Sequence, residues 1–277
     1  MRTLTLKNGD QVPVLGLGTW RMGERAQQRS AEVKALQAGI DLGMTLIDTA
    51  EMYGDGGAEE VVGEAIRGRR DQLYLVSKVL PGNASRKGTV AACEASLKRL
   101  GTDRLDLYLL HWRGNYQLAE TLAAFQDLLK AAKIKAFGVS NFDLRDMQEW
   151  LALAEGDRCL VNQVQYNIAS RGIDFDLLPW CQKQDIAVMA YCPLAQGDIP
   201  AEHGLAKVAK RHGATPAQIM LAWCLRHPNV LAVPKSSQPQ RLAENAKAAE
   251  ISLSAEDLAD LDCDFPAPKQ AEWLAMT

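Results

Sequence analysis

Short apolar runs alternate with longer amphipathic segments along the whole chain. The short runs fall at residues 15–18, 45–48, 73–78, 105–111, 134–140, 161–165, 187–191 and 230–235. Segments with helical spacing of apolar residues separate them, most clearly at residues 31–42, 58–67, 89–100, 118–132 and 144–154. Short apolar strands separated by helices are typical of parallel sheets that are covered on both faces. We therefore predict an α/β fold with eight strands.

Local signals mark where some of these elements begin. Thr215 and Gln218 form a capping box with a proline between them, and Ser254 opens the last helix in the same manner. Asn8-Gly9 lies between two short runs at 4–6 and 11–14. Because both residues tolerate positive φ, this pair predicts an N-terminal β-hairpin with a type I′ turn.

The eight units recur without interruption about every 30 residues, and no linker, charge block or change of composition divides them. We expect a single domain over residues 1–277. A doubly wound open sheet is the alternative, but its phosphate-binding turn needs a third glycine that GLGTW at 16–20 lacks. The pattern predicts a (β/α)8 TIM barrel with an N-terminal hairpin and a short C-terminal tail.

Composition excludes several functional classes. The chain of 277 residues has 31 Lys and Arg against 34 Asp and Glu, so no strong field favours nucleic acid or acidic membranes. No run reaches the roughly 18 apolar residues of a membrane span, and the N-terminus does not resemble a signal peptide. The six cysteines form no C-x-x-C pair, and the four histidines show no metal spacing. We expect a cytoplasmic protein with reduced cysteines that binds no metal, nucleic acid or membrane.

Polar residues end most of the predicted strands. The last residues of the runs are Gly18, Asp48, Lys78, His111, Ser140, Gln165, Tyr191 and Lys235. In a barrel these ends meet at one rim, where such enzymes place their active sites. Three ionisable residues in adjacent units are hard to explain as core residues, since an unpaired buried charge costs several kcal/mol.

The side chains at this rim have the chemistry needed to donate a proton. Tyr53 follows Asp48 by five residues, and a phenol with a pKa of about 10 is a poor acid at neutral pH. An ammonium such as Lys78 would lower that pKa, a carboxylate would orient the ammonium, and His111 could hydrogen-bond a carbonyl oxygen. Such a set suits a carbonyl that accepts hydride, and the hydride has to come from a cofactor. Lys235, Ser236 and Arg241 at the start of a helix would suit its phosphate.

Seven motifs in order resemble those of the aldo-keto reductase family: GLGTW at 16–20, LIDTAEMYG at 46–54, SK at 77–78, LYLLH at 107–111, GVSN at 138–141, NQVQY at 162–166 and VPKSS at 233–237. The likeness runs from residue 16 to about residue 265 and includes all four positions of the family's Asp-Tyr-Lys-His tetrad. It is greatest to bacterial members without long insertions, of the methylglyoxal reductase or diketogluconate reductase kind.

The resemblance implies a role for each matching residue. Tyr53 would donate the proton, Lys78 and Asp48 would tune it, and His111 would orient the substrate. Ser140, Asn141 and Gln163 would hold the nicotinamide carboxamide, and Tyr191 would stack on its ring. The 2′-phosphate would bind Lys235, Ser236 and Arg241, which favours NADPH/NADP+ over NADH. The adenine would contact Glu244 and Asn245, and the remaining implied cofactor contacts are Gly18, Thr19, Trp20, Pro193 and Leu194.

Several positions bear on the substrate pocket. Trp20 and Trp112 would form aromatic walls beside Tyr53 and His111, whereas Trp150, Trp180 and Trp223 lie in helical runs typical of core. Cys192 stands where many relatives have serine, so the hydroxyl contact to the cofactor that a serine would make there is not expected. Val79 follows Lys78 in place of a large aromatic residue, which would widen one wall of the substrate pocket. Trp273 in the tail could fold over the site or be loosely ordered. A tail this short should leave the mouth of the pocket open.

The resulting hypothesis is an NADPH-dependent reductase of aldehydes and activated ketones, including 2-oxoaldehydes such as methylglyoxal and keto-sugars. Two alternatives stay open: a Schiff-base aldolase that uses Lys78, and a catalytically slow NADPH-sensing subunit. We expect the only partner to be a small carbonyl substrate, and the protein to be a monomer or a weak oligomer.

Overall fold

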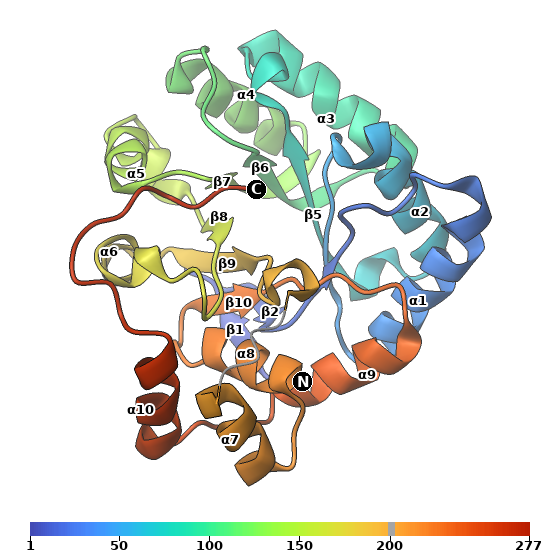
Figure 1. Ribbon diagram of the computed structural model, residues 1–277. Helices are drawn as coiled ribbons and strands as arrows, with labels where there is room; N and C mark the ends of the chain where they lie inside the picture. The colour runs from blue at the N-terminus through green and yellow to red at the C-terminus, as the bar shows by residue number, and fades with distance from the viewer. Residues whose placement is uncertain (199–202) are drawn as a thin grey trace.

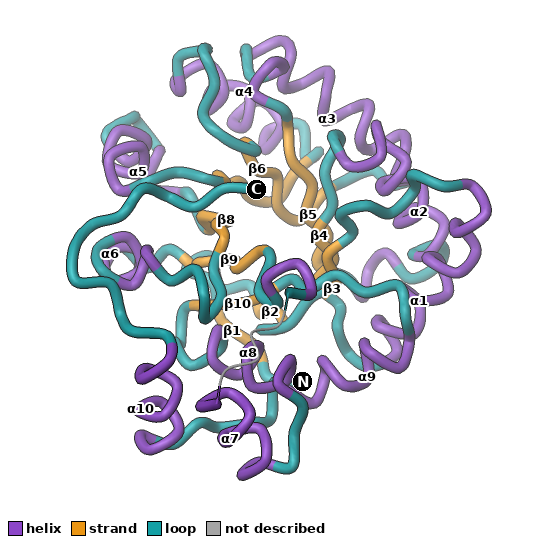
Figure 2. Tube along the Cα trace, in the orientation of Figure 1, coloured by secondary structure: helices purple, strands orange, loops and turns teal. Residues whose placement is uncertain are grey.

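Eight parallel strands curl around a central axis in the computed structural model, which describes residues 1–198 and 203–277 (Figures 1 and 2). The strands follow one another in chain order: β3 (Leu17–Gly18), β4 (Leu46–Asp48), β5 (Tyr74–Val79), β6 (Leu105–Leu110), β7 (Ile134–Ser140), β8 (Val161–Gln165), β9 (Ala187–Tyr191) and β10 (Val230–Ala232). Parallel bridges from Leu15 to Ala232 and from Gly18 to Lys235 join the first strand to the last. The sheet is therefore closed, and the predicted (β/α)8 barrel is confirmed.

Helices surround the barrel (Figure 1). In chain order they are α1 (Arg29–Asp41), α2 (Gly57–Ala65), α3 (Arg86–Leu100), α4 (Leu118–Lys130), α5 (Leu144–Leu151), α6 (Leu177–Lys183), α7 (His203–His212), α8 (Pro216–Cys224), α9 (Pro239–Ala248) and α10 (Ala255–Asp264). Both predicted capping boxes are present, at the start of α8 and of α10. No helix within the described residues is long and apolar enough to cross a membrane.

Most predicted strand limits agree with the structure, and those of β7, β8 and β9 agree residue for residue. The last strand is shorter than predicted, because β10 ends at Ala232 and Lys235 joins the sheet only through its bridge to Gly18. Pro234 has no N–H to donate to a ladder, which accounts for the early end.

The N-terminal hairpin pairs β1 (Thr3–Thr5) with β2 (Gln11–Pro13). Its turn differs from the predicted type I′ turn, since Gly9 has a φ of +92° whereas Asn8 is not among the residues with positive φ. Leu6 and Asp10 close the loop through Leu6 N–H to Asp10 O at 2.9 Å, and Gly9 N–H donates to Leu6 O at 2.8 Å. This is a longer loop with a glycine bulge, in which only one residue needs positive φ.

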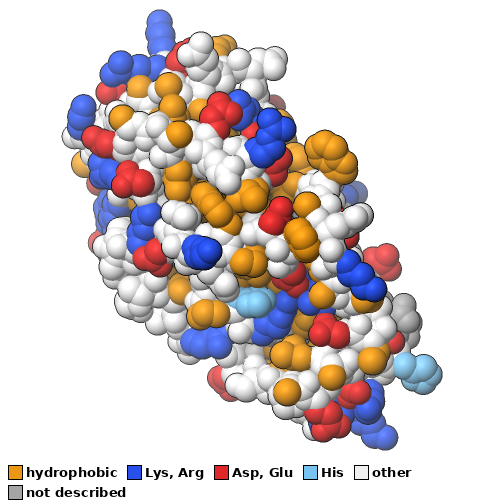
Figure 3. Space-filling view, turned by 90° about the vertical axis from the view of Figure 1, so that its left-hand side faces the viewer, with side chains coloured by type: hydrophobic (Ala, Val, Ile, Leu, Met, Phe, Trp, Pro, Cys, Tyr) orange, Lys and Arg blue, Asp and Glu red, His pale blue; other side chains and the backbone are white. Residues whose placement is uncertain are grey.

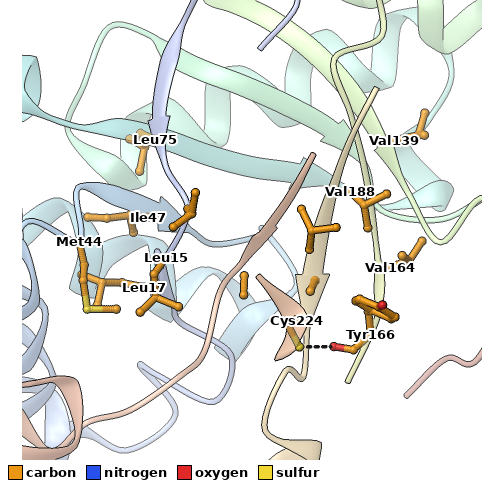
Figure 4. Close-up of a cluster of buried hydrophobic side chains, with 14 of the residues drawn as sticks. Leu15, Leu17, Met44, Ile47, Leu75, Val139, Val164, Tyr166, Val188 and Cys224 are labelled. Carbon is orange, nitrogen blue, oxygen red and sulfur yellow. Dashed lines mark hydrogen bonds between the residues drawn. The ribbon is translucent and has the colours of Figure 1, made fainter. Parts of the chain in front are cut away.

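Two apolar layers form the core. One fills the barrel, and the other, part of which Figure 4 shows, lies between the barrel and the helices. Trp150 and Trp223 are fully buried in the outer layer and Trp180 packs against it, which confirms their prediction as core residues. Val79 is buried in the same layer, so the predicted widening of the substrate pocket at Val79 is wrong. Successive strand residues face opposite sides, and Val79 follows the inward-facing Lys78.

The C-terminal tail after α10 passes outside α6 and turns back over the barrel (Figure 1). Arg171 donates to Phe265 O at 2.6 Å, and a Cβ on Gly172 would lie 2.8 Å from a carboxylate oxygen of Glu272. These contacts hold the tail against the α6 side. On that face of the molecule, hydrophobic side chains lie among charged ones of both signs (Figure 3).

Candidate active site

Lys78 lies at the centre of a hydrogen-bonded cluster at the carboxyl ends of β4 and β5. Its Nζ donates to Asp48 Oδ2 at 2.9 Å, to the Thr49 carbonyl oxygen at 2.9 Å and to Tyr53 Oη at 3.1 Å. The side chain is fully buried. An ammonium group has three protons, and here each has an acceptor. The structure thus brings together three of the four residues of the predicted tetrad.

The loop that carries Tyr53 lies close to the loop that follows β3. Tyr53 opens a short 3-10 turn, Tyr53–Gly56, in which Gly54 has a φ of +59°. A Cβ on Gly54 would lie 2.8 Å from the Met22 carbonyl oxygen. Both the backbone conformation and this close approach require glycine after Tyr53.

His111 completes the cluster directly after β6. Its ring meets Tyr53 edge-on at 5.7 Å and lies 4.9 Å from the Trp112 ring. Burial, with a smaller effect of Lys78, lowers the pKa of His111 to about 2, so the imidazole is neutral. Its Nδ1 is buried without a partner in the described part of the chain. A buried N–H without an acceptor is costly, so the ring proton belongs on Nε2, which can donate to a carbonyl oxygen.

The acidity of Tyr53 differs from the prediction. Burial is the largest effect on Tyr53 and the charge of Asp48 the second, and together they raise the pKa of Tyr53 well above its ordinary value. The predicted net lowering of the Tyr53 pKa is wrong, because burial and Asp48 outweigh the effect of Lys78, whose charge Asp48 compensates at 2.8 Å. Burial lowers the pKa of Lys78, and Asp48 opposes that effect. Tyr53 is therefore a phenol at neutral pH, as a proton donor has to be.

A pocket of about 910 Å³ opens at this rim, and every predicted site residue except the buried Lys78 lines it. These residues are Gly18, Thr19, Trp20, Asp48, Tyr53, His111, Trp112, Ser140, Asn141, Gln163, Tyr191, Pro193, Leu194, Lys235, Ser236, Arg241, Glu244 and Asn245. The hydroxyl of Thr19 is already engaged, since it donates to the Asp48 carbonyl oxygen at 3.0 Å.

Hydrogen bonds join the residues predicted to hold the carboxamide to the tetrad. Gln163 Nε2 donates to Asp48 Oδ1 at 2.7 Å, and Asn141 Nδ2 donates to the His111 carbonyl oxygen at 3.1 Å. Tyr191 Oη donates to Asn141 Oδ1 at 2.8 Å. The ends of β6 to β9 are thereby tied to Asp48 on β4.

Two cations line the same pocket beyond β10. Lys235 and Arg241 form no ion pair within residues 1–198 and 203–277. Ser236 Oγ accepts from Gln238 N–H at 3.1 Å, just before α9 opens with Pro239. Because no carboxylate of the described chain neutralises these cations, the donor set fits a phosphate group.

Sequence reasoning missed several lining residues. They are Arg21, Met52, Gln196, Gly197, the start of α8 at 215–217, Val233, Pro234, Met276 and Thr277. Most lie beyond strand ends, so the strand-end pattern could not point to them. The capping box at Thr215 was visible, but it indicates only where a helix begins.

The tail does not leave the mouth clear, contrary to the expectation of an open pocket. Met276 and Thr277 line the pocket, whereas Trp273 is 96% exposed and covers nothing. Cys192 lies beside the tail, with its Sγ 3.9 Å from Thr277 Oγ1. Burial raises the pKa of the Cys192 thiol, so this cysteine is not an activated nucleophile.

The Aldo/keto reductase family model matches residues 14–263. The chain belongs to the aldo/keto reductase family. Methylglyoxal reductase YeaE of Escherichia coli is 52% identical over 269 residues, which cover 95% of this chain and 94% of that protein. Glyoxal reductase of Bacillus subtilis is 37% identical, with 94% of this chain and 91% of that protein covered.

Among solved structures, an aldo/keto reductase of Klebsiella pneumoniae in complex with NADP and acetate matches with a TM-score of 0.97 and 52% identity, over 99% of both chains. The resemblance inferred from the seven motifs is confirmed. As a member of the aldo/keto reductase family, this protein is an oxidoreductase. The aldolase alternative is not favoured, because a Schiff-base lysine needs a free amine and all three protons of Lys78 are engaged.

Proposed function

We propose that this aldo/keto reductase uses NADPH to reduce small aldehydes and activated ketones, with 2-oxoaldehydes such as methylglyoxal and keto-sugars as substrates. The observation that carries the proposal is the chain of contacts from Asp48 through Lys78 to Tyr53, beside a neutral His111. The methylglyoxal and glyoxal reductases among its relatives support the substrate class.

The chain's residues divide the proton chemistry between them. Bound NADPH supplies hydride to the carbonyl carbon. Tyr53 donates its phenolic proton to the carbonyl oxygen as negative charge develops there, and Lys78 stabilises the phenolate through its hydrogen bond. Asp48 keeps the ammonium charged and oriented. His111 Nε2–H donates to the same oxygen and fixes its direction, while Trp20 and Trp112 wall the pocket.

The cofactor contacts are proposed residue by residue. Ser140, Asn141 and Gln163 would hold the carboxamide and Tyr191 the face of the nicotinamide. The cations Lys235 and Arg241, with Ser236, would bind the 2′-phosphate, which supports NADPH over NADH. The adenine would lie against Glu244 and Asn245. The remaining cofactor contacts would come from Gly18, Thr19, Trp20, Pro193 and Leu194.

We further propose that residues 1–277 act as one catalytic domain, in the cytoplasm, as a monomer or a weak oligomer. All six cysteines are free thiols, which supports a reducing compartment. The near balance of charge gives no support for a nucleic-acid partner.

Tyr53→Phe tests the proposal. It removes only the phenolic hydroxyl, so NADPH oxidation with methylglyoxal should fall almost to background while NADP+ binding persists. Tyr116→Phe is the matched control, because Tyr116 is 41% exposed and lies outside the pocket lining. Retention of more than about one tenth of the activity by Tyr53→Phe would refute the proton-donor role, given that general acid catalysis contributes roughly 100-fold or more. Borohydride trapping of a carbonyl compound on Lys78 would favour the aldolase instead.

A further inference from the structure

Gln163 contacts both the tetrad and the proposed cofactor site. Its Nε2 donates to Asp48 Oδ1 at 2.7 Å, and the other amide proton faces the sulfur of Met189. The side chain is only 1% exposed, yet it lines the pocket. Both protons of the amide nitrogen are therefore used inside the protein.

The partners of Gln163 fix which way its amide lies. Asp48 is paired with the Lys78 ammonium at 2.8 Å and is ionised. An amide oxygen placed against that carboxylate would repel it, so the nitrogen faces Asp48. Gln163 Oε1 has no donor among the described residues, and it is left as an acceptor on the pocket side.

The backbone of Gln163 extends this connection to the next strand. Its carbonyl oxygen accepts from Ser140 Oγ at 2.9 Å and from Asn141 N–H at 2.8 Å. Asn141 in turn donates to the His111 carbonyl oxygen at 3.1 Å. The three residues proposed to hold the carboxamide are thus hydrogen-bonded to one another, to the Asp48 side chain and to the His111 backbone.

We propose that Gln163 is a positioning residue that couples docking of the nicotinamide carboxamide to alignment of the proton donor. A carboxamide N–H on Oε1 would add a third hydrogen bond to an amide that Asp48 and Met189 already hold. The same amide orients Asp48, which holds Lys78 against Tyr53. The inference rests on the proposed function and adds that one side chain both receives the cofactor and keeps the proton donor in line.

The test compares Gln163→Met with Lys235→Gln. Gln163→Met fills the space but removes both the Asp48 bond and the carboxamide acceptor, whereas Lys235→Gln weakens the phosphate site without touching these bonds. Two properties are measured: kcat with methylglyoxal at saturating NADPH, and the Kd of NADP+ without substrate, from quenching of tryptophan fluorescence.

Gln163→Met should lower kcat about tenfold or more, the loss expected from one charge-assisted hydrogen bond. At saturating NADPH this loss should persist, because the missing Asp48 bond disturbs the proton donor whether or not the cofactor is bound. Lys235→Gln should raise the Kd by about tenfold, so that its larger effect is on binding.

A second measurement needs no substitution and so does not depend on a variant that folds. In the acetylpyridine analogue of NADP+, a methyl group replaces the carboxamide NH2 and cannot donate to Gln163 Oε1. The unaltered enzyme should bind it more weakly than NADP+, whereas Gln163→Met should bind the two with similar Kd.

The inference is overturned if Gln163→Met raises only the Kd, as Lys235→Gln does, or if the unaltered enzyme binds the analogue as tightly as NADP+. Failure of the proposed function would look different. The unaltered enzyme would then consume no NADPH with any carbonyl compound, while the substrate-free binding measurements would still decide the role of Gln163.

Discussion

Lys78→Met tests how the protein tolerates the buried charges of its site. The substitution keeps an unbranched chain of similar length but removes three hydrogen bonds from a side chain that is fully buried. Among the residues that the structure describes, Asp48, only 3% exposed, keeps a single side-chain partner in Gln163. Removing one member of a buried ion pair costs about 3–5 kcal/mol, because the other charge stays buried without compensation.

The size of the effect on thermal stability follows from the chain length. At about 2.1 cal/mol/K per residue, 277 residues give an unfolding entropy of about 0.6 kcal/mol/K, so Tm should fall by about 5–9 °C. Adding Asp48→Asn to Lys78→Met removes the uncompensated charge and should restore about 2 kcal/mol or more of the loss. Asp48→Asn alone should destabilise, because it leaves the ammonium buried.

Urea unfolding followed by circular dichroism measures this cycle. The reasoning is refuted if the double variant is as unstable as the sum of the two single variants.

Two further predictions concern the pocket. Arg241→Gln should raise the Kd of NADPH about tenfold or more, because a charge-assisted bond to phosphate contributes about 1.5–3 kcal/mol. The Kd of NADH should stay within about twofold. Equal losses for both cofactors, measured by fluorescence titration, would contradict the assignment of Arg241 to the phosphate. Burial lowers the pKa of His111 to about 2, so the imidazole is neutral at every pH above about 4. The pH profile of kcat should therefore show no acid limb near pH 6.5. An acid limb there that disappears in His111→Gln would show that the imidazole titrates in the working range.

The barrel and its rim could be predicted because they follow from local patterns. A period of about 30 residues sets the number of β/α units, and the last residue of each strand locates the rim. Asp48 and His111 are 63 residues apart in the sequence, and Lys78 lies between them. The parallel register of β4, β5 and β6 nevertheless brings all three to one edge of the sheet.

Other features depend on contacts that the pattern does not encode. The path of the tail follows from the bond of Arg171 to Phe265 O and from the close approach of Glu272 to Gly172, both of which join segments about 100 residues apart. The acidity of Tyr53 depends on how completely Asp48 compensates Lys78, which is a matter of distance and burial. The hairpin turn depended on which of two permissive residues takes positive φ.

The closure of the barrel has a consequence for the order of assembly. The contact between Gly18 and Lys235 spans more than 200 residues, so the entropy of closing that loop is among the largest in the fold. The four tetrad residues all lie within the first 111 residues and leave the ribosome well before β10 does. A growing chain therefore holds all four residues of its proton-transfer set before it holds the strand that closes the rim.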